Sequence, residues 1–357
     1  MQPNKIKKIV LTGGGTAGHV TPNIALIPRL QSLGWDVEYI GTSDGIEQRL
    51  ITEINIPFHG ISSGKLRRYF DLQNFIDPFK IIKGVFDAYF TLGKIKPDLV
   101  FSKGGFVTVP VILGAWLQHI PIIIHESDIT PGLANKISIP FATKICLSFP
   151  ETLKYIPTAN FTGLPIRAEI LEGDAERGRK FCSFNQDSPV LLVIGGSTGS
   201  AKINLAARKI LDQLTTKFQV IHGCGKGNID PNFNDYPNYK QVEYLGVELA
   251  DILAIADVVI SRSGANSIFE FLALKKPHLL IPLSKSASRG DQILNAQSFA
   301  QMGYSMVLAE EDLTSASLWT AINNLFEQRQ KYTDTMSRSE FGDIIGKVSQ
   351  LIDQVVG

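Results

Sequence analysis

The sequence predicts an α/β protein built from two Rossmann-like domains, and one repeated pattern carries this prediction. In each half of the chain, a short aliphatic run leads into a glycine-rich turn and then into a helical pattern. The turns read GGGTAGH at 13–19 and GGSTGS at 195–200. A helix that begins after such a turn presents backbone N–H groups without intrahelical partners, so it binds anions such as phosphates. A length of 357 residues suits two domains of about 150 to 180 residues each.

The first half alternates short β-rich runs with helical patterns. Such alternation is typical of a doubly wound parallel sheet, whose ligands bind beyond the carboxyl ends of the strands. Pro28 falls inside the first helical pattern, where we expect it to kink the helix. We expect strands over 9–12, 37–40, 99–102, 122–125 and 144–147, and helices over 21–33, 45–54, 78–95 and 109–117.

The pattern starts again at residue 190, which predicts a second domain. Gly163 and Pro165 punctuate the end of the first set of strands, so 162–167 is the best linker candidate. We expect the last amphipathic stretch, about 336–355, to pack back on the first domain. The predicted boundaries are therefore 1–163, 164–335 and 336–357. In the second domain we expect strands over 190–194, 219–222, 240–244, 258–261 and 278–282.

Composition narrows the range of functions. The chain is 44% hydrophobic and 19% charged, and its net charge of +1 gives no case for nucleic-acid binding. The three cysteines form no Cys-x-x-Cys pair, so we expect buried, reduced thiols rather than a metal site. Pro110 and Pro121 interrupt the longest apolar stretch, which predicts a helix and a buried strand rather than a membrane span.

The first turn also fits the dinucleotide-binding pattern GxGxxG, so a nicotinamide-dependent enzyme is an alternative. That pattern requires an acidic residue about 20 residues further on, at the end of the second strand, to hold the ribose hydroxyls. Here the expected second strand ends YIGT at 39–42, and the nearest acids, Asp44 and Glu47, lie in the next element. The residues therefore disfavour a dehydrogenase.

Two segments of the second half point to a nucleotide-sugar site. In the segment SRSGANSIFE at 261–270, a strand ends, a glycine allows close approach of a ligand, and Glu270 follows about one turn into a helix. A carboxylate there can accept two hydrogen bonds from a ribose diol, or it can merely complement the helix dipole. Gln292 and Asn295, spaced i to i+3 on one helix face, suit sugar hydroxyls.

Taken together, the motifs resemble those of the MurG family, the N-acetylglucosaminyltransferases that convert lipid I to lipid II in peptidoglycan synthesis. The resemblance runs in register over about residues 8–300, and the set is specific although each motif is weak by itself. Its parts are GGGTAGHxxP at 13–22, HE at 125–126, GxxNK at 132–136, PxR at 165–167, GGS at 195–197, RSGA at 262–265, Glu270 and DQxxNA at 291–296.

The resemblance implies the glycosyltransferase B arrangement, two domains facing across a cleft, with UDP-GlcNAc held mainly by the second. The implied reaction is an inverting transfer of GlcNAc from UDP-GlcNAc to the C4 hydroxyl of MurNAc in lipid I. It implies no cofactor and no metal, and a peripheral protein at the cytoplasmic face of the cell membrane. A UDP-GlcNAc epimerase of the same fold and a non-catalytic nucleotide-sugar-binding protein are the alternatives.

Matching the motifs residue by residue implies the binding roles. Ser197 and its loop would hold the diphosphate, Glu270 the ribose, and the backbone near Leu245, with Arg167, would border the uracil. The remaining implied site residues are Gln292 and Asn295 on the GlcNAc hydroxyls, Ala265, Asn266 and Ser267 lining the donor pocket, and Thr16, Ala17, Gly18 and His19 facing the lipid-linked diphosphate.

Three residues are candidates for the general base. His19 is the natural one, because the pKa of a histidine needs little adjustment for this role, but it can instead bind only a phosphate. Glu126 ends a strand at the same site and can serve as a base or orient the neighbouring loops. Asp128 stands where the family usually has Asn; it accepts hydrogen bonds but cannot donate one, and a carboxylate there can also act as a base.

The stretch 64–96 combines bulky apolar and basic side chains. It holds seven Lys or Arg against three Asp, and Phe75, Phe79 and Phe86 lie among Lys80 and Lys83. An ordinary amphipathic helix packed on the sheet explains its aliphatic positions. Beside an undecaprenyl-linked substrate, the same pattern fits a peripheral patch that binds anionic lipid, and this is the reading we expect.

Overall fold

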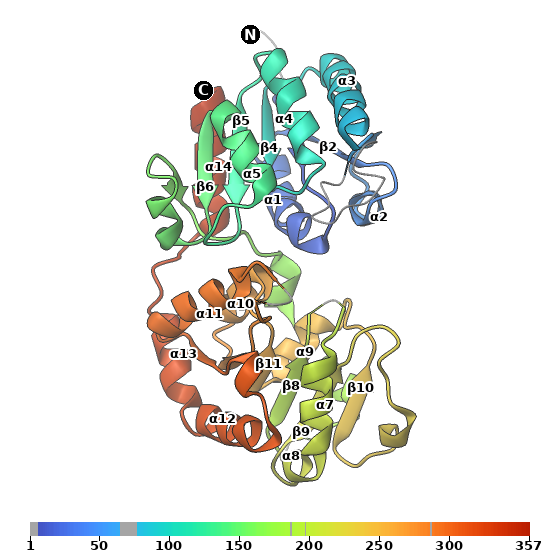
Figure 1. Ribbon diagram of the computed structural model, residues 1–357, viewed down its shortest axis with the longest axis vertical. Coiled ribbons are helices and arrows are strands. Elements are labelled where there is room, and N and C mark those ends of the chain that lie inside the picture. Colours follow the sequence, from blue (N-terminus) through green and yellow to red (C-terminus); the bar gives the residue numbers. More distant parts are fainter. Residues whose placement is uncertain (1–5, 65–76, 186–187, 197, 286–287) are drawn as a thin grey trace. The chain divides into compact units, whose positions relative to one another are not determined.

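The chain runs through two units and ends in the one where it began. The computed structural model describes residues 6–64, 77–185, 188–196, 198–285 and 288–357 (Figure 1). The first unit comprises Met1–Arg167 together with Phe341–Gly357, and the second comprises Ala168–Glu340. Each unit is an α/β domain with its own parallel sheet, as the sequence predicts.

The first unit is built on a seven-stranded parallel sheet. Its strands are β1 (Lys8–Thr12), β2 (Asp36–Thr42), β3 (Phe58–Ile61), β4 (Leu99–Ser102), β5 (Ile122–Glu126), β6 (Lys144–Leu147) and β7 (Asn160–Phe161). They lie in the order β3-β2-β1-β4-β5-β6-β7, so the order reverses between β1 and β4. At that point Thr12 pairs with Ile40 on one side and with Ser102 on the other.

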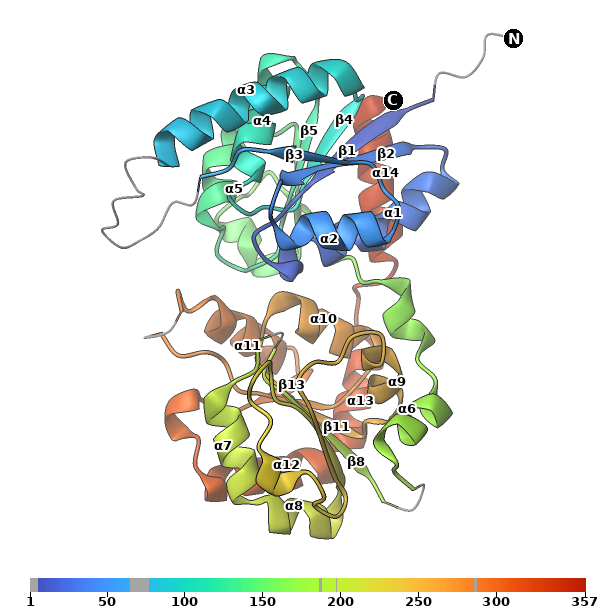
Figure 2. The same cartoon turned by 90° about the vertical axis from the view of Figure 1, so that its right-hand side faces the viewer.

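Helices cover both faces of this sheet (Figure 2). They are α1 (Thr21–Ser32), α2 (Ile46–Glu53), α3 (Asp77–Ile95), α4 (Thr108–Leu117), α5 (Leu133–Ser138) and α14 (Ile344–Val356). One core joins α1 and α14 to the sheet through Leu30 and Ile352, and the other joins α3 and α4 through Leu92 and Ile112. Burial on both faces explains why the inner strands are almost wholly aliphatic.

The carboxyl-terminal helix α14 packs on α1. Val348 and Ile352 are buried in the same cluster as Leu26 and Leu30. The side chain of Asp343 caps the helix by accepting a hydrogen bond from the N–H of Gly346 at 2.8 Å. The chain between Ser337 and Ile344 is not helical, so the stretch expected over 336–355 is interrupted before α14 begins.

The second unit is built on a six-stranded parallel sheet. Its strands are β8 (Val190–Ile194), β9 (Gln219–Gly223), β10 (Tyr239–Val242), β11 (Val258–Ser261), β12 (His278–Leu280) and β13 (Ser305–Val307). They lie in the order β10-β9-β8-β11-β12-β13, so this sheet reverses its order between β8 and β11. There Ile194 pairs with Gly223 on one side and with Ser261 on the other.

Helices also cover both faces of the second sheet. They are α6 (Ala175–Cys182), α7 (Ala201–Lys209), α8 (Leu211–Lys217), α9 (Leu249–Ile255), α10 (Ala265–Ala273), α11 (Asp291–Gln301), α12 (Ser315–Glu327) and α13 (Arg329–Ser337). One core packs α7, α8 and α12 on the sheet around Phe218 and Leu318. Elsewhere Phe269 of α10 and Phe299 of α11 meet edge to face, with ring centroids 5.4 Å apart.

Three short strands were not expected from the sequence. They are β3, β7 and β13, each at or near an edge of its sheet. The strand β3 reads FHGI and β7 has two residues, so neither shows an aliphatic run. Pro28 lies inside α1, which nevertheless continues to Ser32.

Candidate functional site

The two sheets have equivalent edges at their reversal points. In each sheet, the strand next to the reversal point ends in a glycine-rich turn, 13–19 after β1 and 195–200 after β8. Open α/β sheets bind ligands at such switch points, beyond the carboxyl ends of the strands. The strand on the other side of each reversal also ends in a basic residue, Lys103 after β4 and Arg262 after β11.

Polar side chains hold the first glycine turn from beneath. The hydroxyl of Tyr39 donates to the carbonyl oxygen of Gly13 at 2.7 Å. The side-chain amide of Asn23 donates to the carbonyl oxygen of Thr12 at 3.1 Å. Burial raises the pKa of Tyr39, so its phenol stays protonated and remains a donor. The turn is therefore fixed before any ligand arrives.

Glu47 also supports this turn. Its side chain is fully buried, and its two oxygens accept from the N–H of Gly15 at 3.2 Å and that of Thr42 at 3.0 Å. A carboxylate held in this way lies under the loop and is not presented to a ribose. This geometry agrees with the interpretation that the GxGxxG match does not mark a dinucleotide site.

His19 closes the first turn, just before α1. Its Nδ1 lies 3.0 Å from the carbonyl oxygen of Gly14 and 3.3 Å from Oγ1 of Thr16. Because a carbonyl oxygen only accepts, Nδ1 carries the hydrogen in the bond to Gly14, and Nε2 of the neutral ring is the nitrogen that can take up a proton. Thr16 is exposed, and Ala17, Gly18 and His19 are half-buried.

A buried lysine follows β4. Lys103 is 1% exposed, and its ammonium donates to Nδ1 of His125 at 2.8 Å and to Oγ of Ser127. On the other side of the ring, Nε2 of His125 donates to the carbonyl oxygen of Gly163 at 2.9 Å. Burial lowers the pKa of His125 well below its usual value, with a further contribution from Lys103, so the imidazole stays neutral. Burial also lowers the pKa of Lys103 to about 7, against the attraction of nearby carboxylates.

Glu126 holds the loop that follows β5. Its carboxylate accepts from the N–H of Asp128 at 3.0 Å, the N–H of Gly132 at 2.9 Å and the side-chain amide of Asn135 at 2.8 Å. The side chain is buried, and all of these bonds are made within its own loop and α5. This geometry favours the orienting role over the role of general base. Asp128 is half-buried in the same loop.

The second glycine turn requires glycine at 199. Gly199 has φ of +76°, and a Cβ there would overlap the carbonyl group of Cys224. Ser200 then caps α7, its hydroxyl accepting from the N–H of Ile203 at 3.4 Å. The amino end of a nine-residue helix thus opens directly onto the turn.

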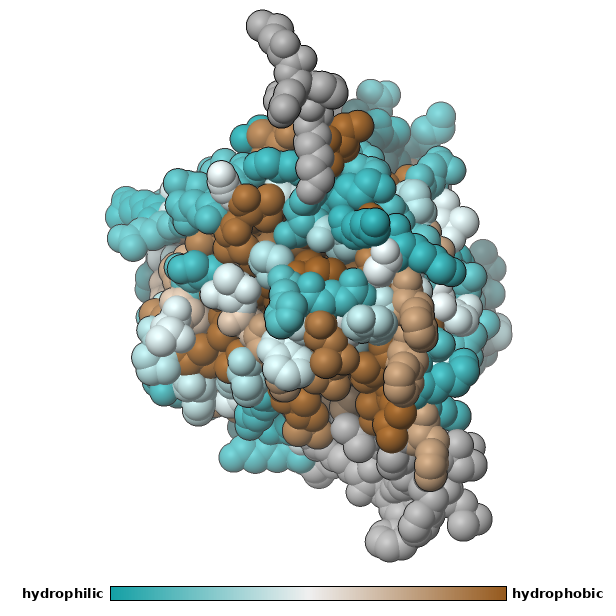
Figure 3. All heavy atoms as spheres, turned by 90° about the horizontal axis from the view of Figure 1, so that it is seen from above, coloured by the Kyte–Doolittle hydropathy of each residue, from teal (hydrophilic) through white to brown (hydrophobic). Residues whose placement is uncertain are grey.

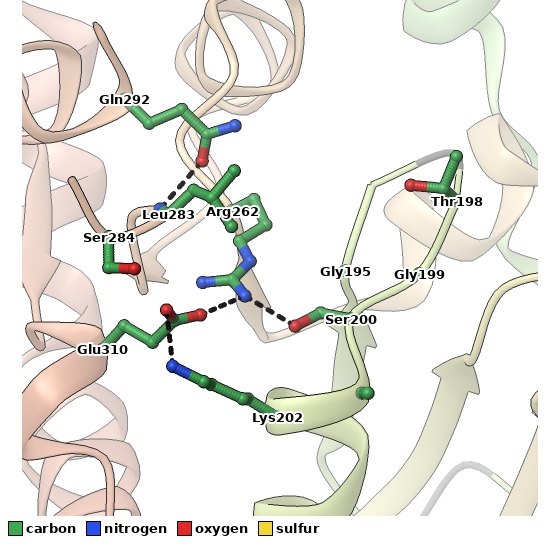
Figure 4. Close-up of a pocket in the computed structure, with 11 residues that line it drawn as sticks. Gly195, Thr198, Gly199, Ser200, Lys202, Arg262, Leu283, Ser284, Gln292 and Glu310 are labelled. Atoms are coloured by element: carbon green, nitrogen blue, oxygen red, sulfur yellow. Dashed lines mark hydrogen bonds and ion pairs between the residues drawn. The ribbon is translucent and has the colours of Figure 1, made fainter. Parts of the chain in front are cut away.

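An ion-pair cluster lies beside this turn (Figure 4). The guanidinium of Arg262 donates to Oγ of Ser200 at 2.7 Å and pairs with Glu310, whose other oxygen accepts from Lys202 at 2.9 Å. Burial by itself would raise the pKa of Glu310, but the hydrogen bonds from Lys202 and Arg262 outweigh it and lower the pKa to about 2. Glu310 is therefore ionised at neutral pH, and two basic side chains face its single carboxylate.

A cavity of about 390 Å³ opens over the turn and the cluster. Its lining is formed by Gly195, Thr198, Gly199, Ser200, Ala201, Lys202, Arg262, Leu283, Ser284, Gln292 and Glu310. Among the residues predicted for the donor, Gln292 lines this cavity. Its Oε1 accepts from the N–H of Leu283 at 3.1 Å, and its amide nitrogen points away from Leu283 (Figure 4).

The other predicted donor residues that the structure describes are not among those that line this cavity, and their environments differ. Glu270 is half-buried on α10, one turn after Ala265, whose side chain is buried. Asn295 is fully buried behind Gln292, where its amide donates to the carbonyl oxygen of Ser263 at 3.3 Å. The rest are half-buried Asn266 and Ser267 in the first turn of α10, buried Leu245 after β10, half-buried Arg167 at the end of the first unit, and Ser197, which lies outside the described residues.

Sequence reasoning assigned no role to Lys103, Lys202 or Glu310. Lys103 had a detectable signal, because SKGG at 102–105 repeats the pattern of a buried strand followed by glycines. Gly105 has φ of +92°, and a Cβ there would overlap the carbonyl oxygen of Gly14. The turn at 102–105 therefore packs on the glycine turn at 13–19. Glu310 had no local signal, since only folding brings it to Arg262, which lies 48 residues earlier.

Within the described parts of the chain, no group of three or more His, Cys, Asp or Glu side chains is placed to hold a metal ion. No helix in these parts combines the length and the apolar character needed to cross a membrane.

Comparison with known proteins shows what this chain is similar to. The glycosyltransferase family 28 N-terminal domain matches residues 9–147, and the glycosyltransferase family 28 C-terminal domain matches residues 190–353. The chain is 55% identical over 347 residues to the "UDP-N-acetylglucosamine--N-acetylmuramyl-(pentapeptide) pyrophosphoryl-undecaprenol N-acetylglucosamine transferase" of Clostridium perfringens, covering 97% of each. A protein of the same name from Geobacillus kaustophilus is 58% identical over 340 residues, covering 94% of this chain and 95% of that one. The crystal structure of Acinetobacter baumannii MurG superposes with a TM-score of 0.75 at 25% identity, covering 98% of this chain and 99% of that one.

Proposed function

The chain belongs to glycosyltransferase family 28 and, within it, to the MurG N-acetylglucosaminyltransferases, and from this premise we propose how its site residues share the reaction. The enzyme transfers GlcNAc from UDP-GlcNAc to the MurNAc residue of lipid I. The acceptor is the C4 hydroxyl, the configuration at C1 of GlcNAc inverts, and the product is lipid II. The epimerase alternative is not favoured, because relatives at 55% and 58% identity are named as transferases.

The single observation that carries the donor assignment is the cavity over the second glycine turn. It combines the amino end of α7 with the cationic side chains of Lys202 and Arg262. A nucleotide diphosphate carries negative charge that develops further as it leaves C1, and fixed N–H groups and cations stabilise that charge. We assign the diphosphate of UDP-GlcNAc to this cavity, with Ser197 and its loop as the first contact.

The remaining donor residues are assigned by motif and by position. Glu270 accepts hydrogen bonds from the two ribose hydroxyls, and the backbone near Leu245, with Arg167, borders the uracil. Gln292 donates its amide hydrogens to GlcNAc hydroxyls, since its oxygen is already held by Leu283. Asn295 was expected on the same hydroxyls, but its side chain is fully buried and donates to the carbonyl oxygen of Ser263, so we assign it a supporting role behind Gln292. Ala265, Asn266 and Ser267 line the pocket in the first turn of α10.

The acceptor side is assigned to the first glycine turn. Thr16, Ala17 and Gly18 face the lipid-linked diphosphate. Nε2 of His19 takes the proton from the C4 hydroxyl as its oxygen bonds to C1 of GlcNAc. The bond between C1 and the UDP oxygen breaks with its electron pair, and UDP leaves. Asp128 is the second candidate for the base, and Glu126 orients the loop that carries it.

A row of exposed apolar side chains on α3 supports contact with a membrane. Phe79, Ile82, Phe86 and Phe90 are 74%, 55%, 59% and 63% exposed, and Figure 3 shows hydrophobic side chains gathered on this face. The opposite face of α3 is buried against the sheet and α4, so packing does not account for this row. We propose that α3, with its lysines, binds anionic lipid at the cytoplasmic face of the cell membrane. Residues 65–76 of the predicted patch, Phe75 among them, lie outside the described residues.

One assay tests the reaction. Purified protein is incubated with UDP-GlcNAc, with and without a soluble short-chain analogue of lipid I, and the products are separated by mass spectrometry. Transfer gives UDP and a glycosylated acceptor only when the analogue is present. Epimerisation without acceptor, or binding without turnover, would refute the proposed function.

A further inference from the structure

The switch points of the two units are equivalent in register. Ser102 pairs with Thr12, the residue before the first glycine turn, and Ser261 pairs with Ile194, the residue before the second. The next residues, Lys103 and Arg262, therefore occupy the same position in their respective sheets. Both are buried basic residues, and each donates to a serine hydroxyl, Lys103 to Ser127 and Arg262 to Ser200.

The backbone fixes where Lys103 lies. Its N–H donates to the carbonyl oxygen of Thr12 at 2.8 Å, which continues the pairing of β4 with β1. Gly13 leaves space for the lysine stem, because a Cβ there would lie 3.2 Å from Cβ of Lys103. The side chain therefore starts beside Gly13, and its ammonium lies at the end of β5 and the loop that follows it.

The ammonium links three segments. It donates to Nδ1 of His125 and Oγ of Ser127, and Nε2 of His125 donates to Gly163, so β4 is joined through β5 to the residues after β7. Removing the ammonium would leave Nδ1 of a buried histidine and the Ser127 hydroxyl without their donor. Such groups are costly to leave unpaired.

The charges that face Lys103 are two carboxylates. Glu126 at the end of β5 and Asp128 in the following loop attract the ammonium, and so does the Cys146 sulfur from β6 when it is ionised. Burial raises the pKa of Cys146 to about 12, so the sulfur is a neutral thiol at neutral pH. His125 is neutral as well. Lys103 is thus the cation that offsets Glu126 and Asp128 among the groups that face it.

We propose that Lys103 is a positioning residue of the acceptor side, whose ammonium holds the 125–128 segment and compensates the carboxylate of Asp128. The inference rests on the proposed assignment of the lipid-linked diphosphate and of Asp128 to this edge of the first unit. A carboxylate beside a diphosphate repels it, and a cation behind the carboxylate removes that repulsion.

Three variants test the compensation: Lys103→Met, Asp128→Asn and the double variant. We expect Lys103→Met to lower kcat/KM for the lipid I analogue about tenfold or more, with the KM for UDP-GlcNAc little changed. In the double variant no carboxylate is left uncompensated at 128, but His125 and Ser127 still lack their donor, so we expect it to regain part of that loss relative to Lys103→Met. A packing role for Lys103 predicts that the double variant is no better than Lys103→Met, and that result would overturn the proposal.

The pH profile gives a second readout. Lys103 carries its positive charge below its pKa of about 7. As the pH rises through that value, the charge that offsets Asp128 is lost. Asp128 raises this pKa, so Asp128→Asn should move the alkaline limb of kcat/KM for the acceptor to lower pH, and Lys103→Met should abolish that limb. An unchanged profile in Asp128→Asn would refute the proposal even if Lys103→Met failed to fold.

A matched control comes from the second unit. Lys276 is a half-buried lysine whose ammonium donates to the carbonyl oxygens of Ala254 and Ala256, each at 3.0 Å, and burial lowers its pKa too. Lys276→Met should lower stability and leave the pH profile unchanged.

A wild type that transfers no GlcNAc would refute the proposed function, whereas normal transfer by wild type, Lys103→Met and Asp128→Asn alike would refute only the role of Lys103.

Discussion

Arg262 and Glu310 form an ion pair that water barely reaches. Their side chains are 10% and 2% exposed, and they lie 48 residues apart in the sequence. Arg262 also donates to the carbonyl oxygens of Ile281 and Pro282, at 3.0 and 3.3 Å, and to Ser200 at the start of α7. Glu310 therefore fixes the cation that borders the second glycine turn, to which we assign the donor diphosphate.

Glu310→Gln should destabilise the protein and weaken donor binding. The change keeps the shape of the side chain but leaves Arg262 as an uncompensated buried charge, which costs about 3 kcal/mol. Urea denaturation at neutral pH measures the loss, and steady-state kinetics should show a raised KM for UDP-GlcNAc. Glu311→Gln changes an exposed neighbour and is the matched control. Equal stabilities of the two variants would contradict the structural role of Glu310.

The stability difference caused by Glu310→Gln should depend on pH. The pKa of Glu310 is lowered from 4.5 to about 2 in the folded protein. A carboxylate with a lowered pKa contributes stability that is present above 4.5 and is lost as the pH falls to about 2. The free energies of unfolding of wild type and variant should therefore converge over that acidic range. A difference that stays constant down to the lower limit would show that Glu310 is not ionised in the pair.

Glu270→Ala should raise the KM for UDP-GlcNAc about tenfold or more, because two hydrogen bonds to a carboxylate are lost. Its position in α10, about one and a half turns into the helix that follows β11, motivates the assignment. Glu176→Ala serves as the control. Glu176 lies in the exposed first turn of α6, where an acid can only complement the helix dipole. An unchanged KM in Glu270→Ala would reduce Glu270 to a residue that complements the helix dipole.

The sequence was sufficient for the parts of the fold and site that depend on neighbouring residues. The aliphatic runs and glycine turns at 8–19 and 190–200 predict both sheets and the position of a glycine turn after the first strand of each, because strand, turn and helix follow one another directly. The edge strands β3 and β13 escaped prediction because their side chains are only partly buried and show no aliphatic run. The roles of Glu310 and Asn295 could not be predicted from the sequence. The pairing of Glu310 with Arg262 and the burial of Asn295 behind Gln292 both result from tertiary packing.

His19→Asn should lower kcat by a factor of about 100 to 10,000 and leave the KM for UDP-GlcNAc little changed. The amide of Asn can reproduce the donor at Nδ1 that bonds Gly14, but it lacks the basic Nε2. Single-turnover kinetics with the lipid I analogue measure the chemical step. If Asp128→Asn loses far more of kcat than His19→Asn, the proton goes to Asp128 instead.

Chelation with EDTA should leave turnover nearly intact. Backbone N–H groups at the start of α7, together with Arg262 and Lys202, supply the positive potential that a leaving diphosphate needs. Activity is measured before and after dialysis against the chelator, and again after Mg²⁺ or Mn²⁺ is added. Loss of turnover that either ion restores would place a metal in the reaction.

The exposed face of α3 should bind vesicles that contain anionic lipid. Phe79, Phe86 and Phe90 supply apolar area, and Lys80 lies among them on an exposed turn. Lys83, one turn further on, pairs with Asp87 at 3.4 Å and donates to Ser62 at 2.7 Å. Its reversal would disturb the helix as well as the surface potential.

The decisive comparison for the membrane is therefore between charge and apolar variants of this face. A basic residue near an anionic surface contributes about 1 kcal/mol, an attraction that salt screens, so Lys80→Glu should weaken co-sedimentation with anionic vesicles at low salt only. Replacing Phe86 and Phe90 with Ser removes apolar area and should weaken binding to anionic and neutral vesicles alike. Lys209→Glu, on an exposed turn of α7 in the second unit, controls for net charge. All of these variants should turn over a soluble short-chain acceptor at the wild-type rate, since none touches the site. Vesicle binding that is equally weak in wild type and variants would place the membrane contact on another surface.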